Sequence, residues 1–373
     1  MLMWAFIAIA VLCGSAAGVI YLVNRLTKFG IYEKLSKGKR WLKYTLSAVT
    51  IVIISVVLTL LWGYINAIIC VLHLVIFWLI FDLVRFIIQK AKKKDIKKSL
   101  SGYLAIPVTV IYLAVGWYLC NNVWVKDYTI ETDKKVGNIK VVQISDSHIG
   151  TTFDGKGFQK YADEILEINP DVVLITGDFV DDGTSKEDMI LSCQAMGSIK
   201  TKYGVYFSFG NHDKGYYGSE QRGYSGDDLI AELEKNNVTV LQDENVLIDD
   251  RFYIIGRQDR SEEVEKNESR ASMEELMAGL DSSKYTIVMD HQPCDYENQA
   301  AAKADLVLSG HTHGGQLIPI NFMGRLISDN CRNYGYEKRD DTNFIVTSGI
   351  SDWEIKFKTG CKSEYVVIDI EGK

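Results

Sequence analysis

The chain has little of two residue types that often carry chemistry. It holds seven cysteines and only six histidines in 373 residues. No two cysteines form a CxxC pair, which excludes the usual cysteine metal sites. Cys331 and Cys361 are the pair we consider for a disulfide, on condition that they lie outside the cytoplasm. Their separation in sequence does not establish the bond.

Positive charge is scarce in the last two thirds of the chain. Residues 124–373 contain 27 Lys or Arg against 45 Asp or Glu, whereas residues 1–123 contain 14 basic residues against three acidic ones. Binding the phosphate backbone of nucleic acid requires clustered positive charge. We therefore expect residues 124–373 not to bind nucleic acid. Dense carboxylates suit divalent cations better, although most of them form a solvated surface.

The first 123 residues are predicted to be a multi-pass transmembrane region in the lipid bilayer of the cell membrane. A helix needs roughly 20 apolar residues to cross the hydrocarbon core. Four stretches meet or approach this length, with a tight helical hairpin, or alternatively a re-entrant piece, around Gly63–Asn66. No positive segment precedes the first stretch, which argues against a signal peptide. The stretches are Leu2–Val23, Leu42–Ile65, Asn66–Ile88 and Tyr103–Asn122.

Basic residues of this region fall into two clusters, Arg25–Lys43 and Arg85–Lys98. Because cytoplasmic loops are enriched in Lys and Arg, both clusters should face the cytoplasm. Four spans then place the C-terminal domain outside the cytoplasm. Within the spans we expect Asp82 to pair with Arg85 and His73 to be a packed core residue, rather than a polar pathway.

Residues 124–373 alternate short apolar runs with amphipathic stretches, which is typical of an α/β domain. The strands expected first are Ile139–Ile144, Val172–Thr176, Val205–Phe209, Thr286–Met289 and Leu306–Leu308, with later ones at Phe344–Thr347 and Tyr365–Ile370. The helices expected are Gly157–Ile168, Lys186–Ile199, Asp227–Lys235 and Met273–Leu280.

Groups that bind metals follow each of the first five expected strands, and five of the six histidines are among them. The segments are Asp146-Ser147-His148, Gly177-Asp178, Gly210-Asn211-His212-Asp213, His291, and Gly310-His311-Thr312-His313-Gly314-Gly315. Ligands bind at the carboxyl ends of strands in α/β sheets, so these residues should converge. Carboxylate, amide oxygen and imidazole together suit manganese, iron or zinc better than the all-oxygen sites of calcium or magnesium.

These motifs resemble those of the calcineurin-like metallophosphoesterases, whose pattern runs D-x-H, GD, GNHD or GNHE, H and GHxH in this order. All five are present between Asp146 and His313. Gly314–Gln316 and the apolar N-terminal region are similar to the bacterial membrane-associated branch of that family. The resemblance implies an α/β fold, a four-layer α/β/β/α sandwich over residues 124–373, preceded by an all-α transmembrane region of about four helices.

The resemblance also implies a site with two divalent metal ions, of which manganese is the expected kind and iron or zinc the alternatives. Asp146, His148, Asp178 and His313 would hold one ion, and Asp178 would bridge to a second held by Asn211, His291 and His311. A hydroxide shared by the ions would attack phosphorus. His212 would protonate the leaving oxygen, and Asp213 either orients the His212 ring or caps a turn.

Other residues near these motifs receive weaker assignments. Asp181 and Asp182 are expected to be surface turn residues. Substrate recognition should come from the segments Lys214–Gly226, Arg257–Arg270 and Gly315–Arg332. Arg257, Arg325 and Arg332 are candidates to bind a phosphate, although surface arginines are common.

The function expected is a metal-dependent phosphoesterase of the phosphodiesterase or pyrophosphohydrolase type. Its substrate would be a phosphate ester, lipid-linked or part of the envelope, at the membrane surface, because the first strand follows the last apolar stretch closely. Two alternatives stay open. One is a general nucleotide or phosphoprotein phosphatase that is anchored incidentally, and the other is a non-enzymatic membrane sensor with a retained metal site.

Overall fold

The computed structural model describes residues 2–217, 219–322 and 330–373. The chain divides into two compact units. One contains residues 1–116 with 354–356, and the other contains residues 117–353 with 357–373. The predicted boundary after residue 123 lies at the start of the first strand, β1 (Val123–Glu131). Each unit is described by itself.

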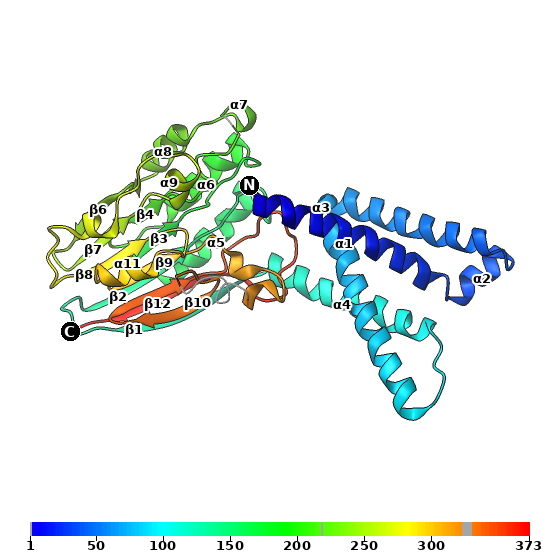
Figure 1. Cartoon of the computed structure of the whole chain (residues 1–373). Helices are drawn as coiled ribbons and strands as arrows, with labels where there is room; N and C mark the ends of the chain where they lie inside the picture. Colours follow the sequence, from blue (N-terminus) through cyan, green and yellow to red (C-terminus); the bar gives the residue numbers. More distant parts are fainter. Residues whose placement is uncertain (1, 218, 323–329) are drawn as a thin grey trace. The chain divides into compact units, whose positions relative to one another are not determined.

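The first unit is helical. Its helices are α1 (Leu2–Leu26), α2 (Gly30–Ser36), α3 (Arg40–Lys92) and most of α4 (Ser99–Asn121). Gly63 interrupts α3 with φ 83° and ψ 164°, a conformation that glycine adopts without a steric penalty. The two halves of α3 therefore run in different directions (Figure 1).

Among the described residues, α3 and α4 are long and apolar enough to cross a membrane, judged by length and composition. The predicted number of four spans stays a prediction. The Asp82 carboxylate accepts a hydrogen bond from the Tyr21 hydroxyl at 2.6 Å and pairs with Arg25, and Arg85 Nε lies 3.6 Å from it. His73 bonds to the Ile69 carbonyl one turn earlier. These four side chains therefore bind one another, and His73 binds its own backbone.

The second unit contains two six-stranded sheets. In the first, the order is β1, β12 (Ser363–Glu371), β2 (Asn138–Ile144), β3 (Val172–Thr176), β4 (Val205–Ser208) and β5 (Val238–Val240). In the second, it is β10 (Gly335–Arg339), β11 (Thr342–Val346), β9 (Leu306–Ser309), β8 (Tyr285–Met289), β7 (Phe252–Gly256) and β6 (Glu244–Ile248). The strands β2–β3–β4–β5 are parallel, as are β7–β8–β9–β11.

Three apolar cores order the sheets and helices into layers (Figure 1). The middle core joins side chains of both sheets, among them Leu174 and Ile287, so the sheets pack face to face. Helices cover the outer face of the first sheet, namely α5 (Gly155–Ile168), α6 (Lys186–Ser198) and α8 (Gly226–Lys235). The outer face of the second carries α10 (Met273–Met277) and α11 (Tyr296–Ala301).

This layering explains why the central strands are apolar throughout. Every residue of β3 and of β8 is buried, because one face meets helices and the other meets the opposite sheet. The helix ends are fixed by local chemistry. The Asp154 and Ser185 side chains cap α5 and α6, and Ser225 forms a capping box with Asp228 at α8.

Several elements were not expected from the sequence. They include β1, β5, β6, β7 and β10, together with the short helices α7 (Ser219–Arg222) and α9 (Arg260–Val264), and the 3-10 turns His313–Gly315 and Ile320–Phe322. The seven expected strands and four expected helices are all present, with ends shifted by a few residues.

Candidate metal centre

Residues that follow four strands form two groups suited to holding a metal ion. One group is Asp146, His148 and His313, and the other is Asp178, His291 and His311. Within each group, one ligand atom from each residue lies within 4.8 Å of the others. Asp146, His148 and Asp178 follow strands of the first sheet, and the other three follow strands of the second. Each group therefore draws residues from both sheets.

Asp178 lies between the two groups. Its Oδ2 is 3.0 Å from His291 Nε2, in its own group, and 3.6 Å from His148 Nε2, in the other. Asn211 belongs beside the second group, because its Oδ1 lies 2.9 Å from His311 Nδ1. Thus the structure brings together the seven residues that the sequence predicted as ligands.

The donor atoms of these residues fit a metal ion. Asp146 Oδ2, His148 Nε2 and His313 Nδ1 are buried and make no hydrogen bond to the described residues. A buried polar atom without a partner costs about 1–3 kcal/mol, so several together at one place indicate a ligand site. Carboxylate, amide and imidazole donors suit divalent transition metals.

The backbone around the site adopts conformations that most residues avoid. Asp146, His148, Asp178, His311 and His313 have φ values of 55°, 37°, 51°, 70° and 47°, all in the left-handed region. Such conformations are sparsely populated by residues with a Cβ, and they concentrate at functional sites. The five ligands are therefore held by the surrounding structure, against their local preference.

Glycines beside the ligands allow the close packing. A Cβ on Gly310 would lie 1.9 Å from Ser145 Oγ and 2.3 Å from Asp146 Oδ2. A Cβ on Gly210 would lie 2.2 Å from Asp178 Oδ1. The glycines of the GN and GH motifs are thus required by the carboxylates that pass them.

Two histidines are oriented by oxygen atoms behind them. His291 Nδ1 lies 2.8 Å from the Thr176 carbonyl oxygen, which only accepts, so Nδ1 carries the proton and Nε2 faces Asp178. His148 Nδ1 lies 3.4 Å from Asp181 Oδ2, while its Nε2 faces Asp178. Asp181 is only 8% exposed. The expectation of a surface turn residue is therefore wrong for Asp181, which contacts a predicted ligand.

Asp182 remains a loop residue, but it has a definite contact. Its carboxylate accepts hydrogen bonds from the backbone N–H groups of Tyr216 and Tyr217 at 3.1 to 3.2 Å. The loop after β3 therefore fixes the start of the segment predicted to recognise substrate.

Asp213 is fully buried and accepts four backbone hydrogen bonds. Its Oδ2 accepts from the N–H groups of Asp178 at 2.9 Å and Gly210 at 2.7 Å, and its Oδ1 accepts from Phe179 at 2.8 Å and Val180 at 3.1 Å. These contacts join the loop after β3 to the loop after β4. Of the two roles considered for Asp213, the geometry favours the turn cap.

Electrostatics couple Asp178 to its neighbours. Burial opposes a charge on Asp178, yet the imidazoles of His291, His212 and His148 hold the pKa of that carboxyl well below its usual range. Burial also opposes a charge on His291, but Asp178 raises the pKa of that imidazole well above its ordinary value. A metal ion bound here competes with the His291 proton.

His212 lies next to both groups without joining either. Its backbone N–H donates to Asp178 Oδ1 at 2.9 Å, and its ring centre lies 5.0 Å from that of His148. The predicted proton donor is therefore adjacent to the predicted bridging carboxylate.

The arginines considered for phosphate binding are already paired. Arg257 is 6% exposed, and its Nη1 contacts Asp290 at 3.1 Å and Asp295 at 2.5 Å. Arg332 pairs with Glu337, with 3.0 Å between Nη2 and Oε1. The phosphate role considered for these two is therefore not supported, and Arg325 lies outside the described residues.

The disulfide considered from the sequence has a different partner. Cys331 is joined to Cys294, three residues beyond His291. Cys361 instead donates its thiol to the His313 carbonyl at 3.1 Å. The Cys331–Cys361 pairing is therefore wrong.

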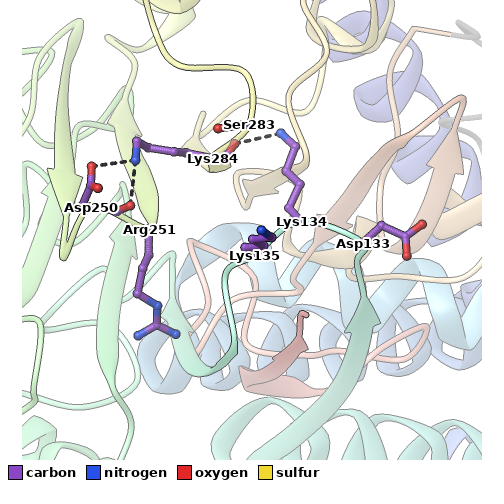
Figure 2. Close-up of a pocket in the computed structure, with 7 residues that line it drawn as sticks. All are labelled: Asp133, Lys134, Lys135, Asp250, Arg251, Ser283 and Lys284. Atoms are coloured by element: carbon purple, nitrogen blue, oxygen red, sulfur yellow. Dashed lines mark hydrogen bonds and ion pairs between the residues drawn. The ribbon is translucent and has the colours of Figure 1, made fainter.

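A concave region lies at the opposite ends of the strands from the two groups. It is a cavity of about 580 Å³ before the starts of β2, β7 and β8, whereas the ligands follow the ends of β2 and β8 (Figure 2). Lys134 bonds to the Lys284 carbonyl and Asp305, Lys284 to Asp250, and Arg251 to the Tyr203 hydroxyl. Lys134 and Lys284 are therefore paired with carboxylates of the chain, and Arg251 is hydrogen-bonded within it. The lining residues are Asp133, Lys134, Lys135, Asp250, Arg251, Ser283 and Lys284.

Comparison with known proteins identifies the family of this region. The model of the calcineurin-like phosphoesterase family matches residues 139–315. An uncharacterized metallophosphoesterase of Campylobacter jejuni is 26% identical, covering 82% of this chain and 79% of its own. One from Helicobacter pylori is 28% identical over 72% and 70%.

A transmembrane protein with a metallophosphoesterase domain from Bos taurus is 27% identical, covering 73% of this chain and 62% of its own. The family predicted from the five motifs is confirmed. Residues 139–315 of this chain are a calcineurin-like metallophosphoesterase domain, and the chain's relatives include transmembrane proteins.

Proposed function

We propose that this chain is a phosphoesterase with two divalent metal ions that cleaves a phosphodiester or pyrophosphate bond at a membrane surface. The observation that carries the proposal is the pair of adjacent groups that meet at Asp178, several of whose buried donor atoms make no hydrogen bond to the described residues. One ion would be held by Asp146, His148 and His313. The other would be held by His291, His311 and Asn211, and Asp178 would bind both ions.

When bound, divalent ions would activate water for attack on phosphorus and neutralise the phosphoryl oxygens. The residues of the chain supply the rest. Thr176 and Asp181 fix the direction of two imidazoles, and Asp213 fixes the backbone that carries Asp178. His212, beside Asp178 but outside both groups, is placed to give a proton to the leaving oxygen.

The membrane part of the proposal rests on other observations. The helices α3 and α4 are long and apolar enough to cross a bilayer, and both basic clusters lie in loops that would face the cytoplasm. The catalytic unit would then lie outside the cytoplasm, where a Cys294–Cys331 disulfide persists. A tethered enzyme favours a lipid-linked or envelope phosphate ester, because such amphiphiles concentrate at the bilayer.

Hydrolysis by the full-length protein in detergent tests the enzymatic part. Bis-4-nitrophenyl phosphate should be cleaved with added Mn²⁺, and iron or zinc should be compared directly. Asp178→Asn should abolish cleavage and metal binding, whereas Asp163→Asn, at an exposed position of α5, serves as the matched control. Absence of turnover with every divalent metal would favour the sensor, and full turnover by Asp178→Asn would refute the two-metal site.

Two further experiments test the membrane part. Liposomal and soluble phosphate esters should be compared as substrates, because a general phosphatase would show no preference for the liposomal ester. Protease added to intact spheroplasts should remove the residues after 123. Their protection would reverse the proposed orientation.

A further inference from the structure

Two exposed aromatic side chains flank the His212 ring. The centre of the Tyr216 ring lies 5.0 Å from that of His212, at an interplanar angle of 78°. The Trp353 ring centre lies 5.1 Å away at 52°. Tyr216 and Trp353 are nevertheless 46% and 43% exposed. Both rings thus contact the imidazole while keeping much of their apolar surface free for another group.

Tyr216 is held at both of its ends. The Asp182 carboxylate binds its backbone N–H at 3.1 Å, and its hydroxyl oxygen accepts a hydrogen bond from Asn211 Nδ2 at 2.6 Å. Trp353 follows Asp352, a fully buried residue whose carboxylate accepts hydrogen bonds from Gln316 and Cys120. An aromatic ring fixed before binding loses little entropy when a ligand arrives.

From this arrangement we infer that Tyr216 and Trp353 form a subsite for a planar, aromatic or heteroaromatic leaving group. The inference rests on the proposed function, in which His212 protonates the leaving oxygen. Water supplies the new P–O bond and releases a proton to solvent, while the P–O bond to the leaving oxygen breaks. The His212 proton passes to that oxygen, and solvent returns a proton to His212. The group attached to the leaving oxygen must then lie next to the rings of Tyr216 and Trp353, because both contact His212.

The chemistry of the rings selects the class of group. Aromatic rings attract one another with centroids roughly 4.5–7 Å apart, in stacked or edge-to-face arrangements, so a planar group gains more here than an aliphatic group of equal size. For a lipid-linked ester, this places the lipid on the phosphorus side of the bond that breaks.

The test uses two phosphonates of similar size, phenylphosphonate and cyclohexylphosphonate. Their binding to the metal-loaded full-length protein in detergent is measured by calorimetry, which needs no turnover, and metal content is determined for each variant. The ratio of the two dissociation constants reports the preference for a planar group. Hydrolysis of bis-4-nitrophenyl phosphate is measured in parallel.

The wild-type protein should bind phenylphosphonate more tightly, and Trp353→Leu should reduce the preference about three- to tenfold. Tyr216→Leu should act similarly, while Tyr216→Phe, which keeps the ring, should retain the preference. Tyr217→Leu is the matched control, because Tyr217 is 64% exposed and the rings found against His212 in the described part of the chain are those of His148, Tyr216 and Trp353.

Equal binding of both phosphonates by the wild type, or an unchanged ratio of dissociation constants in Trp353→Leu, would overturn the inference. Neither result would contradict the proposed phosphoesterase activity. If the ratio falls in Trp353→Leu but no metal supports hydrolysis, the subsite stands as a ligand site and the proposed phosphoesterase activity fails.

Discussion

Replacing Asp213 by Asn separates the two roles considered for this residue. Each carboxylate oxygen of Asp213 accepts two backbone N–H groups. In the Asp213→Asn variant one oxygen becomes an NH2 group, which cannot accept, so two buried N–H groups lose their partner in either orientation of the amide. Since each unsatisfied group costs about 1–3 kcal/mol, the variant should lose about 2–6 kcal/mol of stability.

This loss corresponds to a fall in Tm of about 4–24 °C, at roughly 2–4 °C per kcal/mol for a domain of this size. Thermal unfolding of the metal-free, full-length protein in detergent measures it, with Asp163→Asn as the control. Burial and the neighbouring charge of Asp178 raise the pKa of Asp213 to about 7. The comparison therefore belongs at about pH 8, where the carboxylate is ionised.

The opposite result has a clear meaning. An unchanged Tm, together with an altered pH profile of hydrolysis, would show that Asp213 acts on the His212 ring. The capping role inferred from the four hydrogen bonds would then be refuted.

Three further predictions concern residues around the site. Asp181→Asn should weaken metal binding about 10–100-fold, because it loosens the orientation of His148; unchanged binding in a calorimetric titration would contradict this role. Lys358 is fully buried and donates to the Ser348 and Ser351 carbonyls, so Lys358→Met should cost about 2–4 kcal/mol in urea unfolding, and a neutral effect would count against it. Burial opposes the charge on Glu262, but Lys266 and Lys214 lower the pKa of that carboxyl below its ordinary 4.5. The contribution of Glu262 to stability is therefore present above about pH 4.5 and lost as pH falls through the lower folded pKa. Glu262→Gln should reduce the loss of stability at acid pH. An unchanged loss would exclude the ion pairs of Glu262 as its cause.

The central strands could be predicted from the sequence because they are buried on both faces. Residues 172–176 and 285–289 are nearly continuous apolar runs. Such short runs are typical of strands that are buried on both faces. The strand β10, with the sequence GYEKR, alternates exposed and half-buried positions and pairs only at the edge. Its polar composition does not predict a strand. The strand forms because β10 pairs with β11.

The convergence of the predicted ligands could be expected from the sequence, because their motifs follow strand ends in a recognisable order. The roles of the residues that contact these side chains could not be predicted, because they depend on burial and on contacts between loops. Asp181 and Asp182 are neighbours of the same type, yet one contacts His148 and the other holds the Tyr216 backbone. The sequence is compatible with two roles for Asp213, orienting the His212 ring or capping a turn. Only its four backbone contacts distinguish them.

Both ligand groups combine residues from the two sheets, and this has a consequence for assembly. Asp146 and His313, which share a group, are separated by most of the catalytic chain. An ion held by these groups would therefore bind with full affinity only after both sheets have folded and packed together. Ion binding would then link the two sheets, and removal of the ion by a chelator should lower the stability of the sandwich.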